Sequence, residues 1–104
     1  MNKYIVVTIL CNKQETANKI INTLLEKRLV AGSQVVKVNS KYWWNGELEE
    51  CDEYKLEFRT KEKLFSEIEN VIKQIHDYEV SEISYYEIYN ASSEFLNLID
   101  ENVK

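Results

Sequence analysis

The chain has 104 residues, the size of one small domain, and we expect residues 1–104 to fold around one hydrophobic core. It carries 18 acidic and 13 basic residues, for a net charge of −5 at pH 7. This balance disfavours nucleic acid and anionic membrane surfaces as partners, because both are bound mainly through lysine and arginine. No apolar run reaches the ~20 residues of a membrane span, and the first residues do not resemble a signal peptide, so the expected location is the cytoplasm.

The first third of the chain predicts a strand followed by a helix. Residues 4–10, YIVVTIL, form a β-branched apolar run typical of a buried strand. Asn12, with Glu15 three residues later, resembles a capping box at a helix start. Apolar residues at helical spacing then extend the predicted helix to residue 29, and Gly32 ends this region.

The middle of the chain predicts a long β-hairpin. Val35 begins a strand that runs into Tyr42-Trp43-Trp44, and Asn45-Gly46 is a strong signal for a tight hairpin turn. Apolar residues at 54, 56 and 58 alternate with charged residues on the return strand, so one of its faces is predicted to be buried. Adjacent residues of a strand point to opposite faces, so one tryptophan can join the core while the other needs a partner surface.

The last part predicts a helix, a strand and a final helix. Thr60 is the predicted N-cap of a helix with apolar residues at helical spacing over 64–75, and a strand follows over 80–89. Ser92 or Ser93 is predicted to cap a C-terminal helix. The order βαββαβ plus one helix predicts an α+β, ferredoxin-like fold with a four-stranded antiparallel sheet. Two helices would cover one face, and the other face would expose an apolar patch, which favours an oligomer.

Three segments carry a resemblance to a known family. The run YWWNGELEE, residues 42–50, resembles the YWWxGxIEE signature of the CutA-type divalent-cation tolerance proteins. Residues 76–83, HDYEVSEI, are similar to the family's HPYEVPEI, and residues 95–99 resemble its terminal helix. The resemblance extends over nearly the whole chain, which is identified as a single CutA-like domain. Asp77 and Ser81 replace both prolines of that motif, and the cysteine that many relatives carry after the first helix is absent.

The resemblance implies a homotrimer in which the long hairpin of each subunit pairs with a neighbour's sheet edge, as in the PII signalling proteins. It also implies a non-enzymatic role in tolerance of divalent metal ions, notably copper, and it carries over no catalytic residues. The alternative is a PII-like signalling or structural assembly module with no physiological metal. An RNA-recognition domain and an acylphosphatase-like enzyme share the topology, but residues 54–59 lack the basic and aromatic RNA-binding pattern, and residues 10–14 lack the glycine and arginine of a phosphate loop.

Four residues are candidate metal ligands, and the sequence assigns no cofactor beyond Cu(II) or another divalent cation as the candidate ion. His76 and Glu79 offer an imidazole and a carboxylate, which suit Cu(II) or another divalent cation, but His76 could equally interact with the end of a helix. Cys11 ends the first predicted strand, and Cys51 lies near the beginning of the return strand of the hairpin. The two strands are expected to be antiparallel neighbours, so the two sulfur atoms could lie close together. Adjacent thiols would suit Cu(I) or a redox pair, whereas the alternative is two small buried apolar residues.

A cleft between subunits is the second candidate site. Arg59 lies before a predicted helix start that could receive an anion, and the aromatic run could supply a wall. The predicted lining consists of Tyr42, Trp43, Trp44, Arg59, Thr60, His76, Tyr78 and Glu79. An acidic run formed by Glu47, Glu49, Glu50, Asp52 and Glu53 could attract cations, or could be a solvated strand end.

Overall fold

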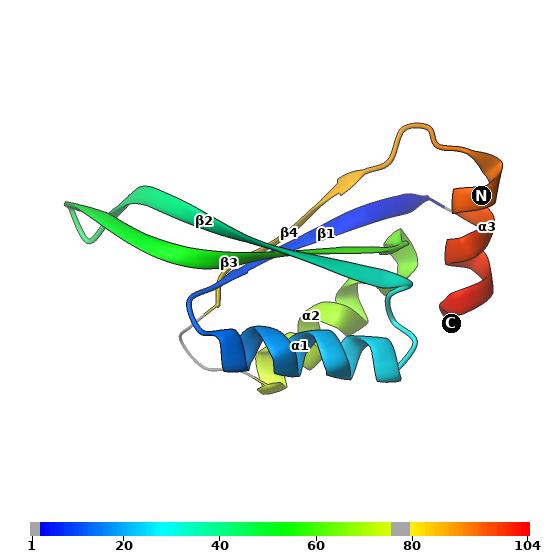
Figure 1. Cartoon of the computed structure of the whole chain (residues 1–104), viewed down its shortest axis with the longest axis horizontal. Coiled ribbons are helices and arrows are strands. Elements are labelled where there is room, and N and C mark those ends of the chain that lie inside the picture. Colours follow the sequence, from blue (N-terminus) through cyan, green and yellow to red (C-terminus); the bar gives the residue numbers. More distant parts are fainter. Residues whose placement is uncertain (1–2, 76–79) are drawn as a thin grey trace.

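The fold is a four-stranded antiparallel sheet with two helices on one face and a third helix at its end (Figure 1). A computed structural model describes residues 3–75 and 80–104. The strands are β1 (Tyr4–Cys11), β2 (Gly32–Trp44), β3 (Glu47–Lys61) and β4 (Val80–Glu87), in the order β2-β3-β1-β4. The helices are α1 (Gln14–Glu26), α2 (Phe65–Ile75) and α3 (Ser93–Asn102), with a short 3-10 turn η1 (Glu62–Leu64). The predicted α+β, ferredoxin-like class is confirmed.

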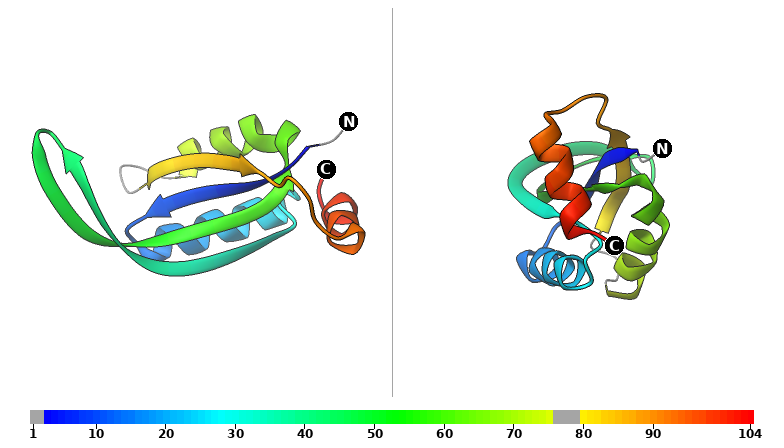
Figure 2. Two further views of the ribbon diagram at one scale, coloured as in Figure 1. Left: turned by 90° about the horizontal axis from the view of Figure 1, so that it is seen from above. Right: turned by 90° about the vertical axis from the view of Figure 1, so that its right-hand side faces the viewer.

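The core lies between the sheet and the helices α1 and α2, which share one face (Figure 2). Val7 of β1 pairs with Phe58 of β3, and Ile9 pairs with Leu56, so these four side chains point to the helix face. All four are fully buried. The helices meet them with the apolar positions that the helical spacing predicted, namely Ile20, Leu24, Ile68 and Ile72.

The first helix begins and ends differently from the prediction. Lys13, and not Asn12, occupies the N-cap position, and its side chain makes no capping hydrogen bond to the helix, so the predicted cap at Asn12 is wrong. The helix ends at Glu26, because Arg28 adopts a left-handed conformation with φ of 58°. This turn carries Leu29 back into the core, where it is fully buried although it lies outside the helix.

Thr60 does not cap a helix, which corrects a second prediction. It lies within β3 and is fully buried, and its hydroxyl donates a hydrogen bond to the Leu29 carbonyl at 2.6 Å. Lys61 takes the N-cap position of η1, and α2 begins only at Phe65. The predicted cap at Ser92 is confirmed, since its Oγ accepts a hydrogen bond from the Phe95 N–H at 3.2 Å.

Helix α3 is held at the end of the sheet, close to the start of β1 (Figure 1). The Asp100 carboxylate accepts hydrogen bonds from the Tyr4 hydroxyl at 3.0 Å and lies 3.1 Å from Lys61 Nζ. These contacts, with Lys61 first, lower the pKa of Asp100. Ile99 of the same helix is fully buried, so apolar and ionic contacts act together at this end.

The open face of the sheet is less apolar than predicted. On β1, Val6 is only 4% exposed, because it lies in a row between the long side chains of Arg59 on β3 and Tyr86 on β4. Exposed apolar side chains instead concentrate on β2 and around the hairpin turn. In this region they are Val35, Val36, Tyr42, Trp43, Trp44 and Leu48, while β4 adds the exposed rings of Tyr85 and Tyr86. The predicted patch therefore exists, but it lies mainly at one edge and one end of the sheet.

Candidate functional site

The hairpin formed by β2 and β3 extends well beyond the rest of the sheet (Figure 1). β1 pairs with β3 only as far as Tyr54, so residues 38–53 pair with each other alone. We call residues 38–53 the hairpin arm. Its turn has Asn45 and Gly46 at φ of 52° and 79°, the paired positive angles that favour these two residue types, so the predicted turn is confirmed.

The end of the hairpin arm carries exposed aromatic side chains. Trp43 is 72% and Trp44 is 63% exposed, and Leu48, which pairs with Trp43, is 60% exposed. The prediction that one tryptophan joins the core is therefore wrong, because the strand has left the core before it reaches this point. Exposed apolar clusters of this kind are typical of protein–protein interaction sites.

Further down the arm, Tyr42 and Cys51 face each other across the two strands. The Tyr42 hydroxyl lies 3.5 Å from Cys51 Sγ, and this contact is the main reason that the pKa of Tyr42 is raised to about 12. The phenol is therefore protonated at any physiological pH. Of the acidic residues predicted as a solvated run, Glu53 differs, because it is almost fully buried.

The two cysteines do not form a joint site. Cys11 pairs with Tyr54, whereas Cys51 lies three residues before Tyr54 in β3, which is a displacement of about 10 Å toward the hairpin turn. An odd number of residues also places the two side chains on opposite faces of the sheet. The predicted thiol pair is therefore wrong. Within residues 3–75 and 80–104, no group of three or more histidine, cysteine, aspartate or glutamate side chains could hold a metal ion.

The predicted cleft residues are split between the two ends of the molecule. Tyr42 pairs with Glu49, ten residues from Arg59 along β3, which is about 30 Å in an extended strand. The aromatic run and Arg59 therefore cannot line one cleft within a single chain. Thr60 is buried in the core and does not line any surface. His76, Tyr78 and Glu79 lie outside the described residues.

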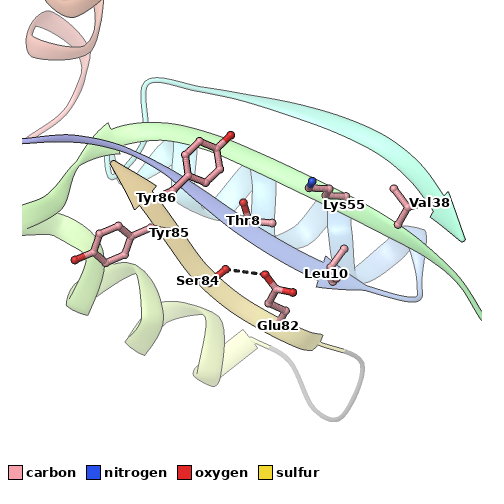
Figure 3. A pocket seen from close by; sticks show the side chains of 8 residues that line it. All are labelled: Thr8, Leu10, Val38, Lys55, Glu82, Ser84, Tyr85 and Tyr86. Atoms are coloured by element: carbon pink, nitrogen blue, oxygen red, sulfur yellow. Dashed lines mark hydrogen bonds between the residues drawn. The ribbon is translucent and has the colours of Figure 1, made fainter. Parts of the chain in front are cut away.

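A trough on the open face was not predicted from the sequence. It has a volume of about 410 Å³ and is lined from all four strands: Val38 on β2, Lys55 on β3, Thr8 and Leu10 on β1, and Glu82, Ser84, Tyr85 and Tyr86 on β4 (Figure 3). We call it the open-face trough. Only the pairing register brings these residues together, since they are up to 78 positions apart and share no motif.

Charged groups follow β3 along the side of the trough. The Glu57 carboxylate lies 3.9 Å from Lys55 Nζ and 3.8 Å from Arg59 Nη2, and it accepts a hydrogen bond from the Tyr86 hydroxyl at 3.3 Å. Burial and the nearby Glu57 raise the pKa of Tyr86. Arg59 Nη1 is buried and has no hydrogen-bond partner among the described residues.

The sheet order, the helices on one face and the projecting arm define a small α+β protein with a surface suited to association. Residues 5–102 match the family model described as CutA1 divalent ion tolerance protein. The chain therefore belongs to the CutA1 divalent ion tolerance protein family, as the sequence resemblance predicted. The family is named for tolerance of divalent ions, and its description names no reaction.

Relatives support this assignment over the full chain. The divalent-cation tolerance protein CutA of Archaeoglobus fulgidus is 32% identical over 104 residues, covering 100% of both chains. The protein of the same name from Pyrococcus horikoshii is 32% identical over 90 residues, covering 86% of this chain and 88% of its own. The solved structure of the Thermus thermophilus divalent cation tolerance protein aligns with a TM-score of 0.91 at 32% identity, covering 97% of this chain and 99% of its own.

One of these comparisons corrects the expected location. The solved structure of the Archaeoglobus fulgidus relative, with a TM-score of 0.88 at 31% identity, is described as a periplasmic divalent cation tolerance protein. The prediction of a cytoplasmic protein is therefore wrong: the amino-terminal residues alone, on which it was based, do not decide the compartment. No helix in the described part of the chain is long and apolar enough to cross a membrane.

Proposed function

We propose that this protein acts without catalysis, as a homotrimer, in tolerance of divalent metal ions including copper. The observation that carries the proposal is the exposed aromatic end of the hairpin arm in a chain of the divalent ion tolerance family. The proposal joins two parts, an assembly built by the arm and a metal site between or beside the subunits, and each can be tested separately.

The arm supports the assembly. Along residues 47–53, β3 pairs with β2 on one side only, so its other edge presents unpaired backbone groups. Trp43, Trp44 and Leu48 add apolar surface next to that edge. Burying one such side chain contributes roughly 1.5–3 kcal/mol. Pairing with the sheet edge of a neighbouring subunit would satisfy the unpaired backbone groups and would bury the apolar side chains. Closed rotational symmetry lets every subunit give one arm and receive one.

The same assembly would complete a cleft between subunits. Within one chain, Tyr42 and Trp44 lie too far along the hairpin arm to contact Arg59. An arm that reaches a neighbouring subunit would bring these two side chains to that subunit's surface. The cleft would combine this aromatic run from one subunit with Arg59, Tyr78 and Glu79 from the next. Thr60 no longer belongs to this set, because its side chain is buried and bonded to Leu29.

We propose His76 and Glu79 as the metal ligands, since imidazole and carboxylate groups suit Cu(II). The thiol pair is dropped, because its two members lie on opposite faces of the sheet. One histidine per chain is few for a tight site, and a trimer would multiply the available ligands.

A calorimetric titration with Cu(II), and separately with Zn(II), in a weakly coordinating buffer tests the metal site. We expect binding at a whole-number ratio to the subunit or the trimer, lost in His76→Ala and kept in Lys73→Ala, a neighbouring change on α2. Fractional binding that survives His76→Ala would overturn the metal site. If sedimentation still shows a trimer, the result favours a signalling or structural assembly module.

A further inference from the structure

The turn of the hairpin arm places an asparagine directly before a glycine. Asn45 is the one asparagine in the chain that a glycine follows. Both residues are exposed, and a Cβ added to Gly46 would meet no atom within 4 Å. The Asn45 side chain forms no hydrogen bond with any residue in 3–75 and 80–104, whereas Asn39 donates one to Asp52 at 3.0 Å. The Asn45 amide and the Gly46 nitrogen are therefore unobstructed.

The turn has little support from the rest of the molecule. None of the described helices lies beneath the end of the arm (Figure 1, Figure 2). Trp44 and Glu47 form the last pair before the turn, and β1 pairs with β3 only as far as Tyr54. A two-stranded hairpin is marginally stable by itself, so its last pair opens at low cost. Opening lets the backbone between Asn45 and Gly46 rotate.

We propose that Asn45 is a site of spontaneous modification, at which the arm loses an amide group through a cyclic imide. The Gly46 nitrogen attacks Asn45 Cγ, so a C–N bond forms while the bond from Cγ to Nδ2 breaks. Nδ2 leaves as ammonia with the proton of the Gly46 N–H. Water then opens the five-membered ring at either carbonyl carbon and leaves aspartate or isoaspartate. Glycine favours the first step, because it has no Cβ beside the attacking nitrogen.

The isoaspartate product changes the turn in two ways. Its backbone runs through Cβ and Cγ, which adds one atom to a turn that needs positive φ at both central residues. It also adds a carboxylate beside Glu47, and like charges repel. The register that pairs Trp43 with Leu48 is therefore lost at this end of the arm. The resulting loss of subunit contacts rests on the proposed trimer, whereas the modification itself does not.

Mass spectrometry tests the modification on the purified protein, incubated at mildly alkaline pH and then digested with trypsin. The digest gives residues 42–55 as one peptide, in which Asn45 is the one asparagine and glutamine is absent. We expect this peptide to gain about 1 Da, the difference between water and ammonia, before any other asparagine peptide does. An isoaspartate methyltransferase should label the same peptide.

Two variants at the same position separate the causes. Asn45→Gly is the matched control, because glycine also favours this turn position but carries no amide, so its peptide should keep its mass. Freshly purified Asn45→Asp adds the charge to an unchanged backbone. After incubation the unchanged protein should sediment as smaller species, and incubated Asn45→Gly should keep its sedimentation coefficient. The Asn45→Asp variant should lie between the two.

The modification is overturned if the peptide of residues 42–55 keeps its mass, or if other asparagine peptides gain mass at the same rate. If the peptide is modified and an assembled protein keeps its sedimentation coefficient, the effect on assembly is overturned. A protein that sediments as a single chain before incubation contradicts the proposed trimer. The mass gain then still decides the modification, so the two failures are distinguishable.

Discussion

The two halves of β3 form one continuous strand but lie in opposite surroundings. Residues 54–61 pair with β1 and β2 and bury Leu56 and Phe58 under the helices. Residues 47–53 pair with β2 alone, and Leu48 is exposed with the two tryptophans that follow each other on β2. The first half is stabilised within its own chain, whereas the second keeps apolar surface for contacts that a single chain does not provide.

The largest expected effect separates two leucines of this strand. Leu56→Ala should lower the free energy of unfolding by about 2–5 kcal/mol at any protein concentration, because it leaves a cavity in the core. Leu48→Ala is the matched change on the hairpin arm, and its effect should depend on protein concentration, because only an assembled arm buries it. Urea unfolding at two protein concentrations measures both. Equal, concentration-independent losses would show that the arm is not an interface.

The second effect concerns assembly. Replacing the arm tryptophans together, Trp43→Ser with Trp44→Ser, should convert the proposed trimer into smaller species, because the apolar contact that each indole would make with a neighbouring subunit is lost. The circular dichroism of the subunit should remain, since neither indole is part of the core. Analytical ultracentrifugation gives the result, and Lys41→Ser on the same strand is the control. An unchanged sedimentation coefficient in the double variant would contradict the role given to the arm.

The smallest effect lies at the far end of the molecule, where α3 meets the sheet. Lys61 and Tyr4 lower the pKa of Asp100, so its folded pKa lies below the unfolded value of about 3.9. An acid whose pKa is lowered stabilises the fold above that value, and the stabilisation is lost as the pH falls through its folded pKa. Asp100→Asn should therefore flatten the decline in melting temperature between pH 5 and about pH 2.

The control for this measurement is Glu101→Gln, the neighbouring acid on the exposed side of α3. Its variant should follow the pH dependence of the unchanged protein. Because the Asp100 side chain is 39% exposed, its contribution should be small and should weaken as salt is added. Identical pH profiles for Asp100→Asn and the unchanged protein would remove this ion pair from the account of how α3 is held.

The site divides into parts that a sequence can and cannot predict. The hairpin turn was predictable, because Asn45-Gly46 acts locally. The exposure of both Trp43 and Trp44 was not, because only the strand pairing shows that the arm has left the core before it reaches them. The Cys11–Cys51 pair failed, because a shift of three residues in register decides both distance and face. The open-face trough was missed for the same reason: Lys55, Leu10 and Glu82 become neighbours only through pairing between distant strands.

The sequence by itself determined the order of the elements, the buried positions of the helices and the family, because periodicity and short motifs act over a few residues. Tertiary structure decided where the chain departs from those local signals. Arg28 ends the first helix in a left-handed turn, and Thr60 is buried in β3 instead of capping α2. Both outcomes depend on Leu29, whose burial and carbonyl contact join segments 31 positions apart. Long-range contacts of this kind gain their free energy only once the whole core has formed.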